Sequence, residues 1–469
     1  MLETSLSNRG YSVSKEHPDT TKIRDLLYVK PHNIMATPNN EPSGFKVYLE
    51  SSKKMYIPKH YGLTHYGIPT INTIVEGIDM QDTLQFHGSL RDNQLEPVQK
   101  FLERARDPQH MGGILQLPPG WGKTVMALYI SHVLHKKTLV VVHKDFLLKQ
   151  WKERIEQYLP NARIGLIKQT IFNTENCDIV LGSLQTICLR DLKDCGFGLL
   201  IVDECHHMGA QVFSQAFHKM NFQYSLGLSA TVNRQDGLTK VFKWFLGDIV
   251  FKAKQVKESG LIVELLEYTD TSPMYCREHL MYNGKPNISK MINTICDYLP
   301  RTRFIVNELK RVLKEEPERN VIILSDRRKH LEDIFEIMIE NGFTEDMMGY
   351  YVGGMKNEAL SLSETKQILL GTYNMVSEGF DLPKLDTLVM ASPKSNVEQS
   401  IGRVQRQLIS ERKHIPMVLD IIDSFSVFKN QSMKRSTFYK KNGYTIIGEP
   451  VCKKDTFVLK GVPFFQSEN

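Results

Sequence analysis

The chain has 469 residues, of which 41% are hydrophobic and 24% are charged, with a formal net charge of +6 at pH 7. This length predicts about three domains, and the composition excludes a wholly disordered, collagenous or fibrous protein. The positive surplus is small for a chain of this size, so it neither requires nor opposes a nucleic-acid partner.

Seven cysteines are scattered along the chain, and no two of them have Cys-x-x-Cys spacing. This spacing argues against a zinc ribbon, a four-cysteine iron–sulfur site and a disulfide framework, and it favours a reducing compartment. The polar N-terminal residues 1–13 lack the apolar region of a secretory signal, and the apolar runs have the length of strands rather than of membrane spans. We expect a soluble intracellular protein.

Residues 1–88 contain several prolines and short β-like pieces at 45–49 and 54–57. They predict a small accessory module that is β-rich or mixed. Nothing in this stretch is diagnostic, and contact with DNA is one role left open for it.

From residue 89 the pattern changes to short apolar strands that alternate with amphipathic helices. Such alternation is typical of a parallel sheet with helices on both faces. Buried strands are predicted at 114–117, 138–142, 178–181, 199–202 and 225–228, and helices at 123–134 and 146–158.

A less regular connector at about 255–300 separates this region from a second strand–helix alternation. Strands are predicted there at 321–324, 348–352, 367–370, 387–390 and 417–420. Two α/β sheets in tandem are the simplest account. The expected domains are 1–88 (accessory), 89–255 (first sheet), 256–430 (second sheet) and 431–469 (basic extension).

The C-terminal stretch 429–469 holds eight Lys or Arg residues and three Asp or Glu residues. Aromatic residues are interleaved with these charges: Phe438, Tyr439, Tyr444 and Phe457. Such a tail is able to stack on bases and contact phosphates. A solvated face around a small aromatic core explains the pattern equally well.

The strongest local signal is Leu-Gln-Leu-Pro-Pro-Gly-Trp-Gly-Lys-Thr at 115–124, where a strand enters a Pro/Gly turn and then a helix. Nucleotide phosphates need backbone N–H donors, a helix N-terminus and a cation held together. We expect Lys123 to reach the β- and γ-phosphates and the Thr124 hydroxyl to bind Mg²⁺. The remaining loop residues expected at the phosphates are Pro119, Gly120, Trp121 and Gly122.

Two residues depart from the strict phosphate-loop pattern. Leu117 stands where the first glycine is usual, and Trp121 stands between the two later glycines. The ring of Trp121 must point away from the phosphates, and slower turnover is one expected consequence.

An apolar strand at 199–202 ends in the adjacent carboxylates Asp203 and Glu204. A hydrolytic ATPase needs one carboxylate to hold Mg²⁺ and another to polarise the attacking water. We expect Asp203 and Glu204 to take these roles. His206 and His207 follow directly, but no further ligand lies at helical spacing, so a zinc site is not expected.

At this point the residues resemble those of superfamily 2 helicases. Asp-Glu-Cys-His at 203–206 resembles the DEAD/DEAH-type box, and Leu-Arg-Asp-Asn-Gln at 90–94 resembles the adenine-side element. The segments 140–151 and 182–186 resemble motifs Ia and Ib. Ser-Ala-Thr at 229–231 resembles the motif that links hydrolysis to strand movement.

In the second sheet the segments 324–327, 371–383 and 399–406 resemble motifs IV, V and VI. The last of these contains Gln399, Arg403 and Arg406, whose spacing of four and then three residues predicts one helical face. The resemblance covers about 90–430. Within the superfamily, residues 227–243, 397–399 and 435–444 are similar to the XPB-like branch. The chain is also similar to compact helicases of large DNA viruses, including the poxvirus transcript-release type.

The resemblance implies two tandem RecA-like parallel-sheet domains and a role for each matching residue. The catalytic residues would be Lys123, Asp203, Glu204, Gln399, Arg403 and Arg406. Besides the phosphate loop, nucleotide would contact Arg91, Gln94, Gly379 and Asp381. Coupling residues would be His206, Ser229 and Thr231. Nucleic-acid contacts would be His143, Lys144, Gln185, Thr186, Arg327, Gly353, Gly354 and Thr372.

We therefore expect an ATP- and Mg²⁺-dependent DNA helicase or translocase, working as a monomer on duplex or forked DNA in viral transcription or DNA metabolism. RNA polymerase or transcription factors are candidate partners, and no membrane is expected. The resemblance leaves open whether the protein is viral, at the virion or replication site, or nuclear. Two alternatives stay open: an RNA helicase built on the same core, and an ATP-switched clamp that remodels a transcription complex without unwinding.

Overall fold

The computed structural model describes residues 3–31, 43–118, 120–230, 236–253, 260–377, 380, 382–407 and 412–449. The chain divides into two compact units, residues 1–254 and 255–469.

The N-terminal part of the first unit is a small mixed module, as predicted. Its five-stranded sheet has the order β5-β6-β2-β1-β7. These strands are β1 (Ser5–Ser7), β2 (Gly10–Ser14), β5 (Leu49–Glu50), β6 (Lys54–Ile57) and β7 (Ile71–Asn72). The module also contains α1 (Thr20–Leu27), α2 (Lys59–Tyr66) and the two-stranded pair of β3 (Tyr28–Val29) with β4 (Phe45–Lys46). The predicted strand at 45–49 is thus divided between two sheets.

Helix α2 attaches this module to the rest of the first unit. Lys59 Nζ donates to the Gln223 carbonyl at 2.9 Å, and His60 Nε2 lies 2.8 Å from Ser225 Oγ. The Tyr61 ring meets the Trp244 ring edge-on at 5.7 Å. Lys59 is only 7% exposed, and burial lowers the pKa of its amine to about 7.

The first unit is built on an eight-stranded sheet with the order β11-β10-β12-β9-β13-β14-β8-β15. Neighbouring strands are parallel except β11, which is antiparallel to β10. The strands are β8 (Gly112–Gln116), β9 (Thr138–Val142), β10 (Ile164–Lys168), β11 (Ile171–Asn173), β12 (Ile179–Ser183), β13 (Leu199–Val202), β14 (Tyr224–Ser229) and β15 (Ile249–Lys252). All five predicted strands of this region are confirmed, whereas β10, β11 and β15 were not predicted.

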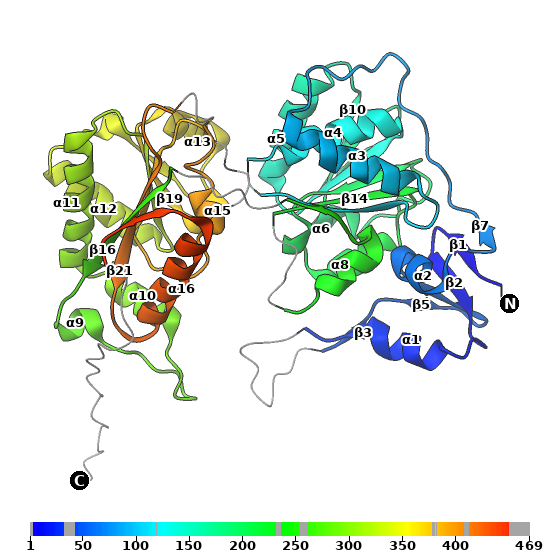
Figure 1. Ribbon diagram of the computed structural model, residues 1–469, viewed down its shortest axis with the longest axis horizontal. Helices are drawn as coiled ribbons and strands as arrows, with labels where there is room; N and C mark the ends of the chain where they lie inside the picture. The colour runs from blue at the N-terminus through cyan, green and yellow to red at the C-terminus, as the bar shows by residue number, and fades with distance from the viewer. Residues whose placement is uncertain are drawn as a thin grey trace, which may run out of the picture. The chain divides into compact units, whose positions relative to one another are not determined.

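Helices cover both faces of this sheet, as Figure 1 shows. One apolar core joins the sheet to α3 (Asp92–Arg106), α4 (Lys123–Leu134) and α5 (Asp145–Tyr158). A second core joins the other face to α6 (Leu184–Ile187), α7 (Ala210–Phe217) and α8 (Thr239–Leu246). The predicted helices α4 and α5 are confirmed.

The second unit is built on a seven-stranded sheet with the order β18-β19-β17-β20-β21-β16-β22, in which all described pairs are parallel. Its strands are β16 (Ile262–Tyr268), β17 (Val321–Ser325), β18 (Met348–Tyr351), β19 (Ile368–Thr372), β20 (Thr387–Met390), β21 (Met417–Asp423) and β22 (Thr445–Ile447). The five strands predicted for this sheet are confirmed.

The interpretation of 255–300 as an irregular connector was wrong. This stretch contains β16, α9 (Pro273–Cys276) and α10 (Ile288–Cys296). Strand β16 lies inside the sheet, between β21 and β22. Two glutamates interrupt its apolar run, so the sequence pattern does not indicate a buried strand. Glu264 forms an ion pair with Arg311 Nη2 at 2.6 Å.

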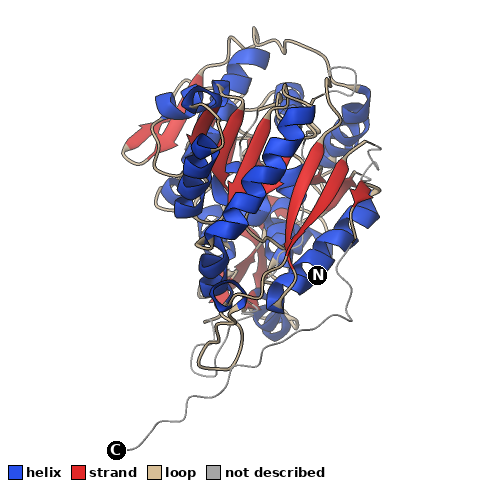
Figure 2. Cartoon of the chain, turned by 90° about the vertical axis from the view of Figure 1, so that its left-hand side faces the viewer, coloured by secondary structure: helices blue, strands red, loops and turns tan. Residues whose placement is uncertain are grey.

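Helices also cover both faces of the second sheet, and Figure 2 shows them crossing in front of its strands. One core contains α11 (Leu299–Glu315) and α12 (Arg328–Glu340). The other contains side chains of α14 (Tyr373–Ser377), α15 (Glu398–Ile401) and α16 (Ser426–Asn442). Helix α13 (Asn357–Thr365) packs beside β18.

Part of the basic stretch is built into the second sheet. Helix α16 crosses the expected boundary at 430, and β22 pairs with β16. Tyr439 is fully buried, and Phe438 and Tyr444 pack on the same core, so the described aromatic residues form the small core that was one of the two interpretations. Phe457 lies outside the described residues.

Two buried ion pairs hold the end of β21. Arg301 binds Asp423 through Nε at 2.7 Å and Nη2 at 2.8 Å. Arg435 binds Asp420 through Nε and Nη2, each at 2.9 Å. These side chains are at most 2% exposed, so each charge depends on its partner for compensation.

Within the described part of the chain, no helix has the length and apolar character needed to cross a membrane.

Candidate nucleotide site and nucleic-acid surface

The phosphate loop connects β8 to α4 in the first unit. Gly120 and Gly122 have φ values of +82° and +73°, a conformation that disfavours residues with a Cβ atom. Helix α4 begins at Lys123, directly after Gly122, so its first N–H groups point toward the loop. The predicted strand–turn–helix arrangement is confirmed, and Pro119 lies outside the described residues.

Gln94 of α3 supports the phosphate loop through a hydrogen bond to its backbone. Its side-chain Nε2 donates to the Trp121 carbonyl at 2.8 Å, and its Oε1 accepts from the Arg91 N–H at 2.9 Å. Gln94 is 2% exposed, so its amide is committed to the backbone of its own chain. The Trp121 ring packs against the core of α3, α4 and α5.

The predicted lysine and glutamate meet at the mouth of the sheet. Lys123 Nζ lies 2.5 Å from Glu204 Oε1, and the two side chains are 13% and 20% exposed. Thr124, half-buried, follows Lys123 in the first turn of α4. Residues 81 positions apart in the sequence are therefore brought together as the motifs predicted.

Asp203 lies beside this pair and is 8% exposed. Its Oδ1 accepts from the Glu204 N–H at 2.9 Å, and its Oδ2 accepts from the Trp151 indole N–H at 2.9 Å. Burial, together with the neighbouring Glu204 charge, raises the pKa of the Asp203 carboxyl, and Lys123 and Trp151 oppose that rise. The Trp151 contact was not predicted, although a buried indole N–H always needs a partner.

Glu204 also contacts the predicted coupling residues. It has a left-handed backbone conformation, with φ +44°. Its Oε2 lies 3.4 Å from His206 Nδ1 and accepts from the Ala230 N–H at 3.4 Å. His206 Nδ1 in turn lies 2.7 Å from Ser229 Oγ. A chain of contacts therefore runs from Glu204 to the end of β14, whereas Thr231 lies outside the described residues.

This geometry fits a nucleoside triphosphate with Mg²⁺. A cation, a helix start and two loop glycines converge there, and a Cβ atom on Gly120 would meet nothing within 4 Å, so this side of the loop is open. Thr124 and Asp203 offer the oxygen ligands that Mg²⁺ prefers. When bound, Mg²⁺ offsets the charge of the phosphates.

Comparison with known proteins now decides the family. Residues 87–234 match the family described as "Type III restriction enzyme, res subunit", and residues 305–408 match "Helicase conserved C-terminal domain". A "Putative ATP-dependent RNA helicase" of Acanthamoeba polyphaga mimivirus is 33% identical over 456 residues, covering 95% of this chain and 86% of the relative. The chain is a superfamily 2 helicase.

A "Probable helicase" of Escherichia phage T5 is 28% identical and covers 71% of this helicase and 73% of its own length. The solved structure of S. cerevisiae Dbp5 bound to RNA and ADP BeF3 has a TM-score of 0.50 and 14% identity, covering 76% of this chain and 94% of that one. This likeness concerns the fold alone. The predicted fold class, two RecA-like domains with a small N-terminal mixed module, is confirmed.

In the first domain of the helicase, the loops after β9 and β12 carry the candidate nucleic-acid residues. The exposed Gln185 side chain donates from Nε2 to the His143 carbonyl at 3.0 Å, which joins the two loops. Lys144 occupies the N-cap position of α5. Thr186 is buried, and its hydroxyl accepts from the Gln169 N–H at 3.0 Å and lies 3.0 Å from Ser183 Oγ. Thr186 therefore supports the loop from inside.

In the second domain, Arg327 is anchored by its own chain. Its guanidinium donates to the Ser289 carbonyl at 3.1 Å, to Ser289 Oγ at 3.0 Å and to Asn293 Oδ1. These contacts fix the start of α12 on α10. Of the other candidates, Gly353 and Gly354 are exposed after β18, and Thr372 is half-buried at the end of β19.

The motif VI residues do not share one long helical face, which corrects the prediction. Helix α15 contains Gln399 but ends at Ile401, and turns follow. Arg403 is 7% exposed and donates from Nη1 to the Phe380 carbonyl at 2.7 Å, whereas Arg406 is half-buried. The Arg403 contact joins the segments that resemble motifs V and VI. Gly379 and Asp381 lie outside the described residues.

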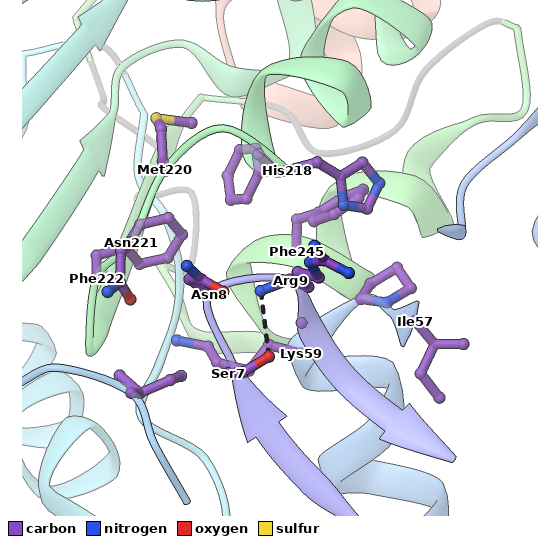
Figure 3. Close-up of a pocket in the computed structure, with 14 residues that line it drawn as sticks. Ser7, Asn8, Arg9, Ile57, Lys59, His218, Met220, Asn221, Phe222 and Phe245 are labelled. Carbon is purple, nitrogen blue, oxygen red and sulfur yellow. Dashed lines mark hydrogen bonds between the residues drawn. The ribbon is translucent and has the colours of Figure 1, made fainter. Parts of the chain in front are cut away.

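A separate small pocket lies between the N-terminal module and the first RecA-like domain. Figure 3 shows Arg9, Lys59 and Asn221 around it, with the Phe245 ring on the domain side. Its lining contains none of the predicted nucleotide or nucleic-acid residues.

Proposed function

We propose that this helicase couples ATP hydrolysis to movement along DNA or to its unwinding, in viral transcription or DNA metabolism. The observation that carries the ATPase part is the 2.5 Å contact of Lys123 with Glu204, beside Asp203 and at the start of α4. This places a phosphate-binding cation, a candidate base and a candidate metal ligand in one site.

Each residue of this site has a proposed role. Lys123 leaves Glu204 and binds the β- and γ-phosphates, which frees the carboxylate to orient the attacking water and accept its proton. Thr124 and Asp203 would hold Mg²⁺. Gln94 is proposed to support the loop through the bond from its Nε2 to the Trp121 carbonyl. Arg91 is proposed to line the adenine side.

The second RecA-like domain is proposed to complete the site when the two domains close. Arg403 and Arg406 would act as arginine fingers on the γ-phosphate, and Gln399 would orient the water or a finger. Such a guanidinium contributes about 10³–10⁵ in rate. The guanidinium of Arg403 donates from Nη1 to the Phe380 carbonyl, which ties the turn after α15 to the segment that resembles motif V. Gly379 and Asp381 stay proposed contacts to the nucleotide.

Nucleic acid is proposed to run over the loops that follow the strands of both domains. Lys144, Gln185 and the exposed Gly353–Gly354 turn offer a cation, an amide and accessible backbone N–H groups. Such groups bind phosphates irrespective of sequence, as a motor requires. The hydrogen bond from Gln185 to the His143 carbonyl supports a common surface of these two loops. We propose a monomer that works with RNA polymerase or transcription factors.

RNA is the second candidate substrate, because the mimivirus relative carries the name of an RNA helicase. DNA is favoured by the similarity of residues 227–243 to the XPB-like branch. The deciding measurement is ATPase activity with duplex DNA, forked DNA, single-stranded DNA and RNA in parallel. Stimulation by DNA supports the proposal, and stimulation by RNA alone overturns its substrate.

A strand-displacement assay belongs beside this ATPase assay. Hydrolysis together with displacement or translocation supports the motor. Robust hydrolysis with neither displacement nor translocation on any substrate would favour the ATP-switched clamp instead. The same ATPase core can hydrolyse ATP without separating strands.

A further inference from the structure

Trp151 is a buried residue of α5 that touches the candidate metal ligand. Its side chain is 2% exposed, and its indole N–H donates to Asp203 Oδ2 at 2.9 Å. Trp donates through this single N–H group and accepts nothing. The bond is therefore directional, and it joins two residues that lie 52 positions apart in the chain.

The Asp203 carboxylate is held from two sides. Its Oδ1 accepts from the Glu204 N–H at 2.9 Å, while Trp151 holds Oδ2. The Asp203 main chain is fixed as well, since its N–H donates to the Val141 carbonyl of β9 at 3.0 Å. With the backbone and one oxygen fixed, the indole N–H decides how the carboxylate plane is turned.

We propose that Trp151 is a positioning residue that orients the Asp203 carboxylate toward the Mg²⁺ of the bound nucleotide. This inference rests on the proposed role of Asp203 as a Mg²⁺ ligand. It adds Trp151, a residue that does not bind the metal itself but holds the ligand. Groups that orient metal ligands in this way typically change metal affinity 10- to 100-fold when they are removed.

The same bond links the metal ligand to the nucleic-acid surface. Lys144 occupies the N-cap position of helix α5, and the preceding His143 carbonyl accepts from Gln185. Trp151 lies on this helix about 10 Å from its start.

The test uses tryptophan fluorescence, because the chain has only three tryptophans. In the double variant Trp151→Phe, Trp244→Phe, the remaining Trp121 in the phosphate loop reports nucleotide binding without turnover. We expect this protein to need about 10-fold more Mg²⁺ for half-maximal ADP binding than the Trp244→Phe control. Equal Mg²⁺ requirements would overturn the proposal.

A double-mutant cycle separates positioning from a general packing defect. If Trp151 acts through Asp203, the change Trp151→Phe has no further effect on Mg²⁺ dependence in an Asp203→Asn background. Additive effects would overturn the proposal. Unfolding midpoints measured on the same proteins identify any loss of stability.

A third measurement keeps Trp151 in place, in case its replacement prevents folding. In a Trp121→Phe, Trp244→Phe protein, adding Mg²⁺ and ADP should shift the emission of Trp151, and Asp203→Asn should abolish the shift. An unchanged shift in the asparagine variant would overturn the proposal. Failure of the proposed function is distinct, because wild-type protein would then consume no ATP with any nucleic acid.

Discussion

Gln94 Nε2 occupies the space that a Cβ atom on Gly122 would need. This contact explains why the loop has no side chain at its last position before α4. The amide of Gln94 reaches across Gly122 to the Trp121 carbonyl, so glycine allows both the left-handed backbone and the support from α3.

The variant Gly122→Ala should therefore lose more nucleotide affinity than the variant Gly120→Ala. Both residues have positive φ, so each alanine costs about 1–2 kcal/mol in backbone strain. Only the alanine at 122 also collides with Gln94. Nucleotide affinity measured by calorimetry should fall further for Gly122→Ala, and equal losses would contradict the role of Gln94.

The change Lys123→Ala should abolish measurable ATP turnover. It removes the cation that lies 2.5 Å from Glu204 and is proposed to bind the phosphates. Removing one such preorganised group typically costs about 10²–10³ in kcat. The matched variant Glu204→Gln should also lose turnover but keep ATP binding, as measured with a labelled nucleotide. Substantial hydrolysis by the glutamine variant would exclude Glu204 as the base.

Arg406→Ala should reduce nucleic-acid-stimulated ATPase by about 10³-fold or more if Arg406 is a finger. Its unfolding midpoint should change little, since it is half-buried. Arg403→Ala should lower both activity and stability, because Arg403 is 7% exposed and holds the Phe380 carbonyl. Full ATPase activity in Arg406→Ala would refute the finger role.

The central strands and the phosphate loop could be predicted because their signals are local. The bounds of β9, β13 and β20 equal the predicted ranges, since a strand buried on both faces is a continuous apolar run. Strand β16 was missed because Glu264 and Glu267 interrupt its apolar run. Its burial depends on strands that lie far along the chain.

The sequence predicted the residues of the candidate site that lie in recognisable motifs, but not the contacts between different motifs. Lys123, Asp203 and Glu204 meet as expected, but the bond from Trp151 to Asp203 joins two different motifs, and no spacing rule connects them. The helical face at 399–406 failed because helix spacing alone does not show that Arg403 bonds to the Phe380 carbonyl. Tertiary contacts overrode local periodicity there.

The buried amine of Lys59 should make stability depend on pH. Its pKa is about 7 in the folded protein and ordinarily 10.5, so between these values the unfolded chain binds more protons. The free energy of unfolding should then rise with pH, by up to about 1.4 kcal/mol per pH unit from this group. Urea unfolding at pH 7, 8 and 9 should show a smaller rise in Lys59→Met. Identical slopes would contradict the burial of a neutral amine.

The ion pair of Arg435 with Asp420 should dominate the stability contribution of α16. Arg435→Met leaves a buried carboxylate without its cation, which costs about 3–5 kcal/mol. Lys434→Met, at the exposed neighbouring position, should stay within about 0.5 kcal/mol of wild type. Urea denaturation checks both variants, and similar losses would show that the pair contributes nothing specific.

The place of β16 in its sheet has a consequence for biosynthesis. Its two neighbours are formed by residues 417–423 and 445–447, more than 140 positions downstream. A nascent chain leaving the ribosome must hold residues 262–268 without their native partners until that distant segment has been translated. Contacts of such long sequence separation form slowly. We therefore expect the second domain to complete its fold late, and this strand to be where chaperones engage it.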